Sequence, residues 1–160
     1  MLFVGILMLI CCLAFAWREY AAYLGREMRE TDELLAFIKH IRERMNCYLE
    51  PISAWVGEYS TPELERLGFL GALRNGVDIK QAFADCSDKM CISSEVSDTF
   101  SNTLSEMGDF YLESELDALE LAVDKLSAAQ KRVNDDYKNK IKASGAMLAA
   151  VAIGAVVLVI

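Results

Sequence analysis

Charged side chains are absent from both ends of this chain of 160 residues. Residues 1–17 contain none, and neither do residues 143–160, so every Lys, Arg, Asp and Glu lies between the two runs. At about 1.5 Å of rise per helical residue, the runs extend roughly 25 Å and roughly 27 Å. The hydrocarbon core of a bilayer is about 30 Å thick, so each run suffices if its helix continues into the interface. The sequence therefore predicts a transmembrane helix at each end.

The sequence also lacks the motifs of common enzymes. No glycine-rich loop precedes a Lys-Ser or Lys-Thr pair, which excludes a P-loop ATPase, and no G-x-S-x-G element is present. His40 is the single histidine, and we interpret it as a half-exposed helix residue. The five cysteines include no C-x-x-C pair, and Cys86 and Cys91 have no histidine nearby to complete a metal site. These absences predict a protein that is not an enzyme and that uses no metal, cofactor or small-molecule substrate.

Basic residues flank both predicted spans on the side of the central segment. They are Arg18, Arg26 and Arg29 after the first run, and Lys131, Arg132, Lys138, Lys140 and Lys142 before the second. Lys and Arg next to a span favour the cytoplasmic side. The predicted order is a transmembrane helix over 1–17, a cytoplasmic helical bundle over 18–142 and a transmembrane helix over 143–160. The cysteines of a cytoplasmic domain would stay reduced.

A cleaved signal peptide is the alternative interpretation of the first run. Ala14-Phe15-Ala16 resembles a small-x-small cleavage site, although the start of the chain has no Lys or Arg, which signal peptides usually carry. We favour a retained anchor. Under the alternative, the mature chain begins near Trp17 and is exported.

Between the two runs, apolar residues recur at spacings of four and three, which is typical of one face of a helix. The first such seam begins at Leu34, and Thr31 and Asp32 are candidates to cap the ordered part of its helix. Pro51 is expected to break this helix near its end. The second seam begins at Leu112, and with no Gly or Pro before residue 145 its helix is predicted to continue into the second span.

Cap and turn signals predict short helices between the two long ones. The signals are Ser60-Thr61-Pro62-Glu63 for a helix to about Leu73, the turn Asn75-Gly76, Asp78 for a helix to about Met90, and Ser93-Ser94-Glu95 for a helix that Gly108 interrupts. Short helices between two long ones favour an antiparallel bundle within one chain over a coiled coil between chains. The predicted fold class is therefore all-α, with an antiparallel bundle of about six helices between two transmembrane helices.

Two features of the sequence are candidates for binding. The first is an acidic cluster that suits a basic protein partner, although a solvated helix face gives the same pattern. The second is a four-residue spacing of small residues in the second span, which permits close packing of membrane helices and also arises by chance in an alanine-rich span. The acidic cluster is Glu106, Asp109, Glu113, Glu115, Asp117 and Glu120, and the small residues are Ala146, Ala150 and Gly154.

The end of the chain resembles the stage III sporulation protein AB family. The resemblance is clearest from Lys125 to Gly145 and in the span that follows, and it extends to residues 100–108 and to the glycine turn with its short helix at residues 75–83. This family is similar to the cytoplasmic F domain of type II secretion and type IV pilus machines. The resemblance implies a membrane platform beside a cytoplasmic secretion ATPase, similar to stage III sporulation protein AA. It also implies a location in the membrane around the forespore, with the domain in the mother-cell cytoplasm.

We therefore expect a membrane adaptor that docks a cytoplasmic secretion ATPase and joins other membrane subunits of the same complex, without binding nucleic acid. Charge reversal at Glu113, Glu115 and Asp117 is expected to weaken recovery of the ATPase. An exported coiled-coil scaffold with a cleaved signal is the alternative. A small holin-like protein is a third hypothesis, which the large acidic body argues against.

Overall fold

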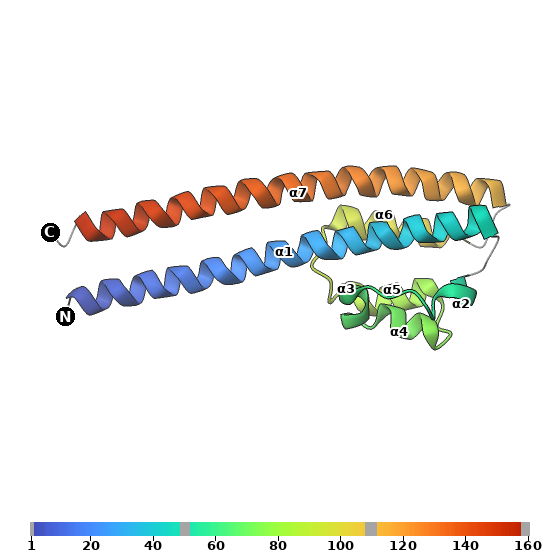
Figure 1. Cartoon of the computed structure of the whole chain (residues 1–160), viewed down its shortest axis with the longest axis horizontal. Coiled ribbons are helices and arrows are strands. Elements are labelled where there is room, and N and C mark those ends of the chain that lie inside the picture. Colours follow the sequence, from blue (N-terminus) through green and yellow to red (C-terminus); the bar gives the residue numbers. More distant parts are fainter. Residues whose placement is uncertain (1, 49–51, 108–111, 158–160) are drawn as a thin grey trace.

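Two long antiparallel helices and five short ones make up the described part of the protein (Figure 1). The computed structural model describes residues 2–48, 52–107 and 112–157. The long helices α1 (Leu2–Tyr48) and α7 (Leu112–Val157) lie side by side, and the short helices gather at one end of the pair. The short helices are α2 (Ile52–Trp55), α3 (Pro62–Arg66), α4 (Phe69–Arg74), α5 (Ile79–Ser87) and α6 (Ser94–Glu106). The predicted all-α fold is confirmed, and we call α2–α6 with the adjoining parts of α1 and α7 the body.

The two long helices continue without a break past the predicted domain boundaries. Neither α1 near residue 17 nor α7 near residue 143 is interrupted, so each predicted span and the neighbouring bundle helix form one element. The predicted cap at Thr31 and Asp32 is wrong for the same reason, because both residues lie inside α1. The Thr31 hydroxyl donates to the Glu27 carbonyl over 2.8 Å, a bond within the helix.

No helix contains an apolar stretch long enough to cross a membrane within the residues that the structure describes. The spans predicted over 1–17 and 143–160 are therefore not confirmed.

Two side-chain hydrogen bonds show the register of the long pair. The Trp17 indole N–H donates to the Ser144 hydroxyl over 2.9 Å, and the Gln130 amide donates to an Asp32 carboxylate oxygen over 2.7 Å. Both helices advance by nearly the same number of residues between these two bonds. The antiparallel register is thus kept from the body into the outer part of the pair, and Trp17 and Ser144 lie at the same level.

Aromatic side chains from α1, α4, α5 and α6 form the centre of the core. The Phe37 and Phe69 rings meet edge to face with centroids 5.2 Å apart, and the Phe83 and Phe100 centroids are 4.6 Å apart. Edge-to-face and tilted contacts are favourable arrangements for aromatic pairs. Full burial of each ring stabilises the fold by about 1.5–3 kcal/mol relative to leaving the ring exposed to water. The predicted seams supply much of the surrounding core, including Leu34, Ile38 and Ile41 from α1 and Leu119, Val123 and Leu126 from α7.

Local signals place the short helices with one difference from the prediction. The Asp78 carboxylate accepts from the Lys80 N–H over 3.0 Å, and the Ser93 hydroxyl accepts from the Val96 N–H over 3.3 Å, so both predicted caps are confirmed. Gly76 has φ +79°, as the predicted turn requires. However, the single helix expected from residue 60 to about Leu73 is two helices, because Gly68 with φ +83° turns the chain between α3 and α4.

A polar cluster fastens α3 to α1. The Glu33 carboxylate on α1 accepts from the Glu63 N–H and the Leu64 N–H, both at 2.9 Å through Oε2, and so caps the start of α3. The predicted cap Thr61 stands at the capping position, but its side chain makes no capping bond. Arg29 on α1 donates to Glu63 over 2.7 Å. The start of α3 is therefore held by α1 rather than by its own preceding residue.

The same cluster reaches the loop between α5 and α6. The Glu30 side chain is fully buried and accepts from Arg66 over 2.7 Å and from the Cys91 N–H over 2.5 Å. Arg66 also donates to Glu63 over 2.8 Å. Hydrogen bonds from Arg29 and then Arg66 hold the pKa of the Glu63 carboxyl below its ordinary value, although burial opposes this shift. This cluster joins segments far apart in the sequence, and no local pattern predicted it.

Candidate functional site

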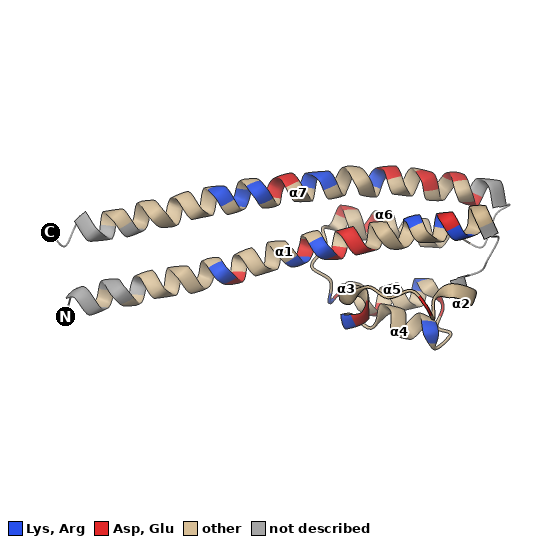
Figure 2. Ribbon diagram, viewed as in Figure 1, with Lys and Arg blue, Asp and Glu red and all other residues tan. Residues whose placement is uncertain are grey.

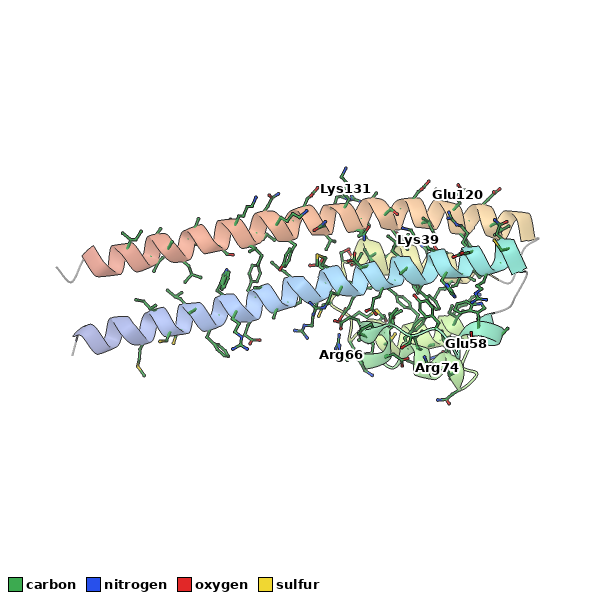
Figure 3. The ribbon with its side chains drawn as sticks, viewed as in Figure 1. Lys39, Glu58, Arg66, Arg74, Glu120 and Lys131 are labelled. Atoms are coloured by element: carbon green, nitrogen blue, oxygen red, sulfur yellow. The ribbon has the colours of Figure 1, made fainter. Side chains whose placement is uncertain are left out.

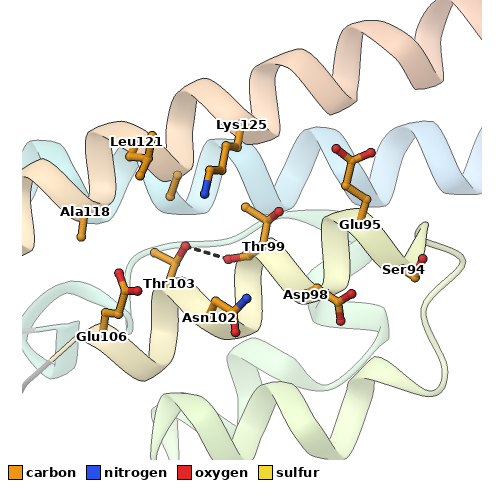
Figure 4. A pocket seen from close by; sticks show the side chains of 11 residues that line it. Ser94, Glu95, Asp98, Thr99, Asn102, Thr103, Glu106, Ala118, Leu121 and Lys125 are labelled. Atoms are coloured by element: carbon orange, nitrogen blue, oxygen red, sulfur yellow. Dashed lines mark hydrogen bonds between the residues drawn. The ribbon is translucent and has the colours of Figure 1, made fainter.

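A groove with a volume of about 420 Å³ lies between α6 and α7 (Figure 4). On the α6 side it is lined along the whole helix, from Ser94 to Glu106. On the α7 side the lining residues are spaced by three and four, which places them on one face of that helix. They are Ala118, Leu121, Ala122 and Lys125. We call this feature the α6–α7 groove.

The α6–α7 groove combines an exposed apolar residue with acidic side chains. Leu121 is 55% exposed, and Ala118 and Ala122 beside it are small. Asp98 and Glu106 lie on the α6 side. The Thr103 hydroxyl donates to the Thr99 carbonyl over 2.7 Å, so its one hydrogen-bond donor is used within α6 (Figure 4). A surface of this kind offers apolar contact in the middle and negative charge along one edge.

Only part of the predicted acidic cluster borders the α6–α7 groove. Glu106 lines it, whereas Glu115 is half-buried and takes part in an interaction within the chain. Asp117 and Glu120 are exposed on α7, and Glu120 points away from α1 (Figure 3). Asp109 lies outside the described residues, and so does the side chain of Glu113. The six residues therefore do not form one described surface, and their role in binding stays a prediction.

The small residues of the second predicted span lie on an exposed face of α7. Ala146, Ala150 and Gly154 are all exposed, and a Cβ atom added at Gly154 would have no neighbour within 4 Å. The residues of α7 that approach α1 are others, such as Ser144 with its bond to Trp17. The small residues are thus not at the contact between α1 and α7, and their packing against another membrane helix stays a prediction.

Charge is graded along the long pair (Figure 2). The outer ends of α1 and α7 show no charged residues, Lys and Arg follow in the middle of α7, and Asp and Glu dominate its end at the body. Arg18, Lys138 and Lys142 are exposed just inside the level marked by Trp17 and Ser144. Lys140 pairs with Asp136 over 3.2 Å, and the bond to this carboxylate raises the pKa of the Lys140 ammonium.

The exposed aromatic residues near this level lie on α1. Tyr20 is 43% exposed and Tyr23 is 46% exposed, and both follow Trp17 within two helical turns. Tyr and Trp are enriched where a membrane meets water, because one end of the ring is apolar and the other is polar. This part of the pair therefore has the side chains of an interfacial segment.

His40 packs at the edge of the aromatic core. Its ring centroid lies 4.6 Å from that of Trp55 and 4.9 Å from that of Tyr59. Burial, and then the charge of Arg44, lower the pKa of His40. Burial raises the pKa of Tyr59 to about 12. The half-buried imidazole serves as a packing group, which agrees with the interpretation of His40 as a half-exposed helix residue.

The fold defines the class to which this chain belongs: an all-helical body carried on two long antiparallel helices. Within the described residues, no three His, Cys, Asp or Glu side chains are grouped to hold a metal ion. The model of the stage III sporulation protein AB family matches residues 2–160, and the chain belongs to that family. Comparison with the curated proteins and with the solved structures finds no match.

Proposed function

We propose that this sporulation protein is a membrane-anchored adaptor without enzymatic activity. Residues 1–17 and 143–160 cross the membrane as a helical hairpin, and the body lies in the cytoplasm. In a sporulating cell this places the protein in the outer forespore membrane, with the body facing the mother cell. Its complex resembles a type II secretion system, in which the body corresponds to the F domain.

The level of Trp17 and Ser144 is the observation that carries the proposal. The inner boundary of each charge-free run lies next to the body, near Trp17 in α1 and near Ser144 in α7. A direct hydrogen bond between these two residues holds the two boundaries side by side. Two apolar segments whose inner boundaries lie at the same level can enter one flat bilayer surface together. Exposed basic residues follow directly, where the headgroups of an anionic membrane attract them. If the two charge-free runs had no common role, their inner boundaries would not have to lie at the same level of the helix pair.

The body would then meet a basic partner in the cytoplasm, which we propose to be the secretion ATPase. Residues 43–129 contain seventeen acidic and six basic residues, so this part of the chain carries strong negative charge. An anionic membrane repels such a surface, whereas a basic protein is attracted to it. Asp117 and Glu120 are exposed on α7 at the end far from the charge-free runs, where a soluble partner has access.

Pull-down of the purified ATPase by the full-length protein tests the docking. The triple variant Glu106→Lys, Asp117→Lys and Glu120→Lys should recover at least about tenfold less ATPase than the wild type, because attraction becomes repulsion. A matched control with the same change in net charge is Glu58→Lys, Asp85→Lys and Asp88→Lys, in exposed positions between α2 and α6. Equal recovery by both triple variants would reject the surface of Glu106, Asp117 and Glu120 as the docking side. Failure of the wild type to recover any ATPase would reject the docking itself.

Intact-mass measurement of the membrane-purified protein separates the anchor from an exported scaffold. The proposal predicts that residues 1–17 are retained. A mature chain that begins near Trp17 would instead support the exported scaffold.

A further inference from the structure

We propose that the α6–α7 groove is the docking site for a basic amphipathic helix of a partner protein. The inference rests on the proposed function for the cytoplasmic location of the body, and it deepens that function by naming a surface and the chemistry of its occupant. The occupant would lie along the two helices with an apolar face toward α7 and basic residues toward α6. Helix-in-groove binding is a common mode of peptide recognition.

The dimensions of the groove suit a helix. Its lining continues along α6 from Ser94 to Glu106, and a helix of this length extends roughly 20 Å. A partner helix of three to four turns, roughly the same length, therefore contacts α6 along its entire length. The opposite wall offers the half-buried Ala118, whose small side chain allows close approach, whereas Ala122 is buried in the core beneath it.

Leu121 supplies an apolar anchor at the middle of the α7 wall. Among the described residues from Leu24 to Lys140, the exposed large apolar side chains are Leu121 at 55% and Val77 at 37%. Val77 lies in the turn between α4 and α5 and is not part of the groove. The exposed Leu121 beside the half-buried Ala118 gives an apolar patch that a partner residue can cover, and covered apolar contacts supply much of the affinity of an interface.

The charges of the groove favour a basic occupant. Asp98 and Glu106 form no ion pair among the described residues, so their carboxylates are available to a ligand. Glu95 at one end is already paired with Arg132 over 2.6 Å. Lys125 is the basic residue of the lining, and it lies on the α7 wall. Asp117 is one turn before Leu121 on the same face of α7 and adds an acidic residue at the edge.

The same charges argue against two other occupants. A second copy of this chain would bring its own acidic body against the groove, and like charges repel. An anionic lipid surface is disfavoured for the same reason. A basic helix from a different protein is the occupant that the apolar patch and the acidic edge accept together.

Binding of a synthetic peptide to the full-length protein tests this inference. The protein is held in nanodiscs of uncharged phosphatidylcholine, with empty nanodiscs as the blank. The probe is a fluorescent helix-forming peptide of Lys, Leu and Ala, about five turns long, with leucines on one face. A peptide of the same composition with leucines spread around the helix is its control, and fluorescence anisotropy gives Kd. The inference predicts that the amphipathic peptide binds at least about tenfold more tightly than its control.

Variants locate the binding site. Leu121→Ser and the pair Asp98→Asn with Glu106→Gln should each raise Kd by about tenfold. The matched controls Val77→Ser and Glu58→Gln with Asp88→Asn should change Kd by less than about twofold, because they make the same chemical changes outside the groove. A photoreactive leucine in the peptide should cross-link to residues 94–106 or 118–125.

Any of these results would overturn the inference: no binding by the wild type, equal effects of the groove and control variants, or cross-links outside the groove. Self-association of the protein that competes with the peptide would also overturn it, in favour of a second copy. The ATPase pull-down is a separate measurement. If the ATPase is not recovered while the peptide binds in the groove, the docking of the ATPase is rejected and the groove inference stands.

Discussion

The two halves of the α1–α7 pair differ in what covers their apolar side chains. At the body, short helices cover the pair, and large residues such as Phe37 and Leu126 are fully buried. In the outer half, α1 and α7 have each other alone among the described elements, and Phe15 and Ile153 are each 65% exposed. The body therefore has a core that suffices in water. The outer half has an apolar surface of the kind that marks contact with another protein or with lipid.

The largest expected difference between the halves comes from removal of a phenylalanine. Phe37→Ala should lower the free energy of unfolding by about 3–5 kcal/mol, because it empties a fully buried position between Phe69 and Phe100. Phe15→Ala removes a ring that is 65% exposed and should change the value by less than about 0.5 kcal/mol. Denaturant unfolding of the full-length protein in uncharged detergent measures both. Similar losses in the two variants would mean that the outer half contributes to the same core.

A smaller effect is expected from the polar cluster that joins α1 to the short helices. Glu30→Ala leaves the Cys91 N–H without its acceptor and should destabilise the protein by about 1–3 kcal/mol. Glu95→Ala is the matched control, because its partner Arg132 and Glu95 itself are both largely exposed. Such surface pairs contribute about 0–1 kcal/mol. The same unfolding experiment compares the two, and an equal loss would show that the buried cluster does not hold α3 and the following loop.

Acid should weaken the body through Glu63. Hydrogen bonds from Arg29 and Arg66 lower the pKa of this carboxyl in the folded protein below its ordinary value of 4.5. Its contribution to stability is therefore fully present above about pH 4.5 and is lost as the pH falls through the lowered pKa. Glu63→Gln should be less stable than the wild type at neutral pH, and the gap should close in acid. Denaturant unfolding at several pH values measures the gap, and a gap independent of pH would exclude this role.

The smallest expected effect is at the contact between the outer helices. Ser144→Ala removes the acceptor of the Trp17 indole N–H and should cost about 0.5–1 kcal/mol. The emission of Trp17 should change, because the indole loses its hydrogen-bond partner. A variant with Trp55→Phe isolates this signal, since the chain has two tryptophans. Ser127→Ala, a half-buried residue of α7 within the body, is the control. Unchanged Trp17 emission in Ser144→Ala would show that the bond is not formed in solution.

Local sequence patterns were sufficient to predict where helices form but not where each helix begins and ends. The spacing of Leu34, Ile38 and Ile41 predicted a buried face, and all three are buried. Asp78 and Ser93 were found as caps, because a cap depends on residues two or three positions away. The predicted cap at Thr31 is wrong, because a threonine inside a helix and a threonine that caps one can have similar neighbours in the sequence. Only the helical turns that precede Thr31 in α1 distinguish the two cases.

The candidate site depended on contacts that the sequence does not show. The acidic residues near α7 were visible as a cluster, yet Glu115 is half-buried while Asp117 is exposed. Which residues face outward depends on how α7 lies against α1 and α6. The α6–α7 groove and the Glu30 cluster combine segments distant in the sequence, so neither has a local pattern. Leu121 is the residue through which the sequence could have indicated the groove. It is apolar, yet it does not fall on the four-and-three spacing of the seam that begins at Leu112.

Alkaline carbonate extraction of membranes from sporulating cells tests most directly that residues 1–17 and 143–160 cross the bilayer. High pH removes proteins held by charge, but it leaves transmembrane helices in the lipid. If both segments span the bilayer, the full-length protein stays in the membrane pellet. Ala150→Lys, which should cost about 2.5–3.5 kcal/mol in the middle of a span, should be recovered less than the exposed body variant Ala128→Lys. Complete release of the wild-type protein into the supernatant would show that neither segment crosses the bilayer.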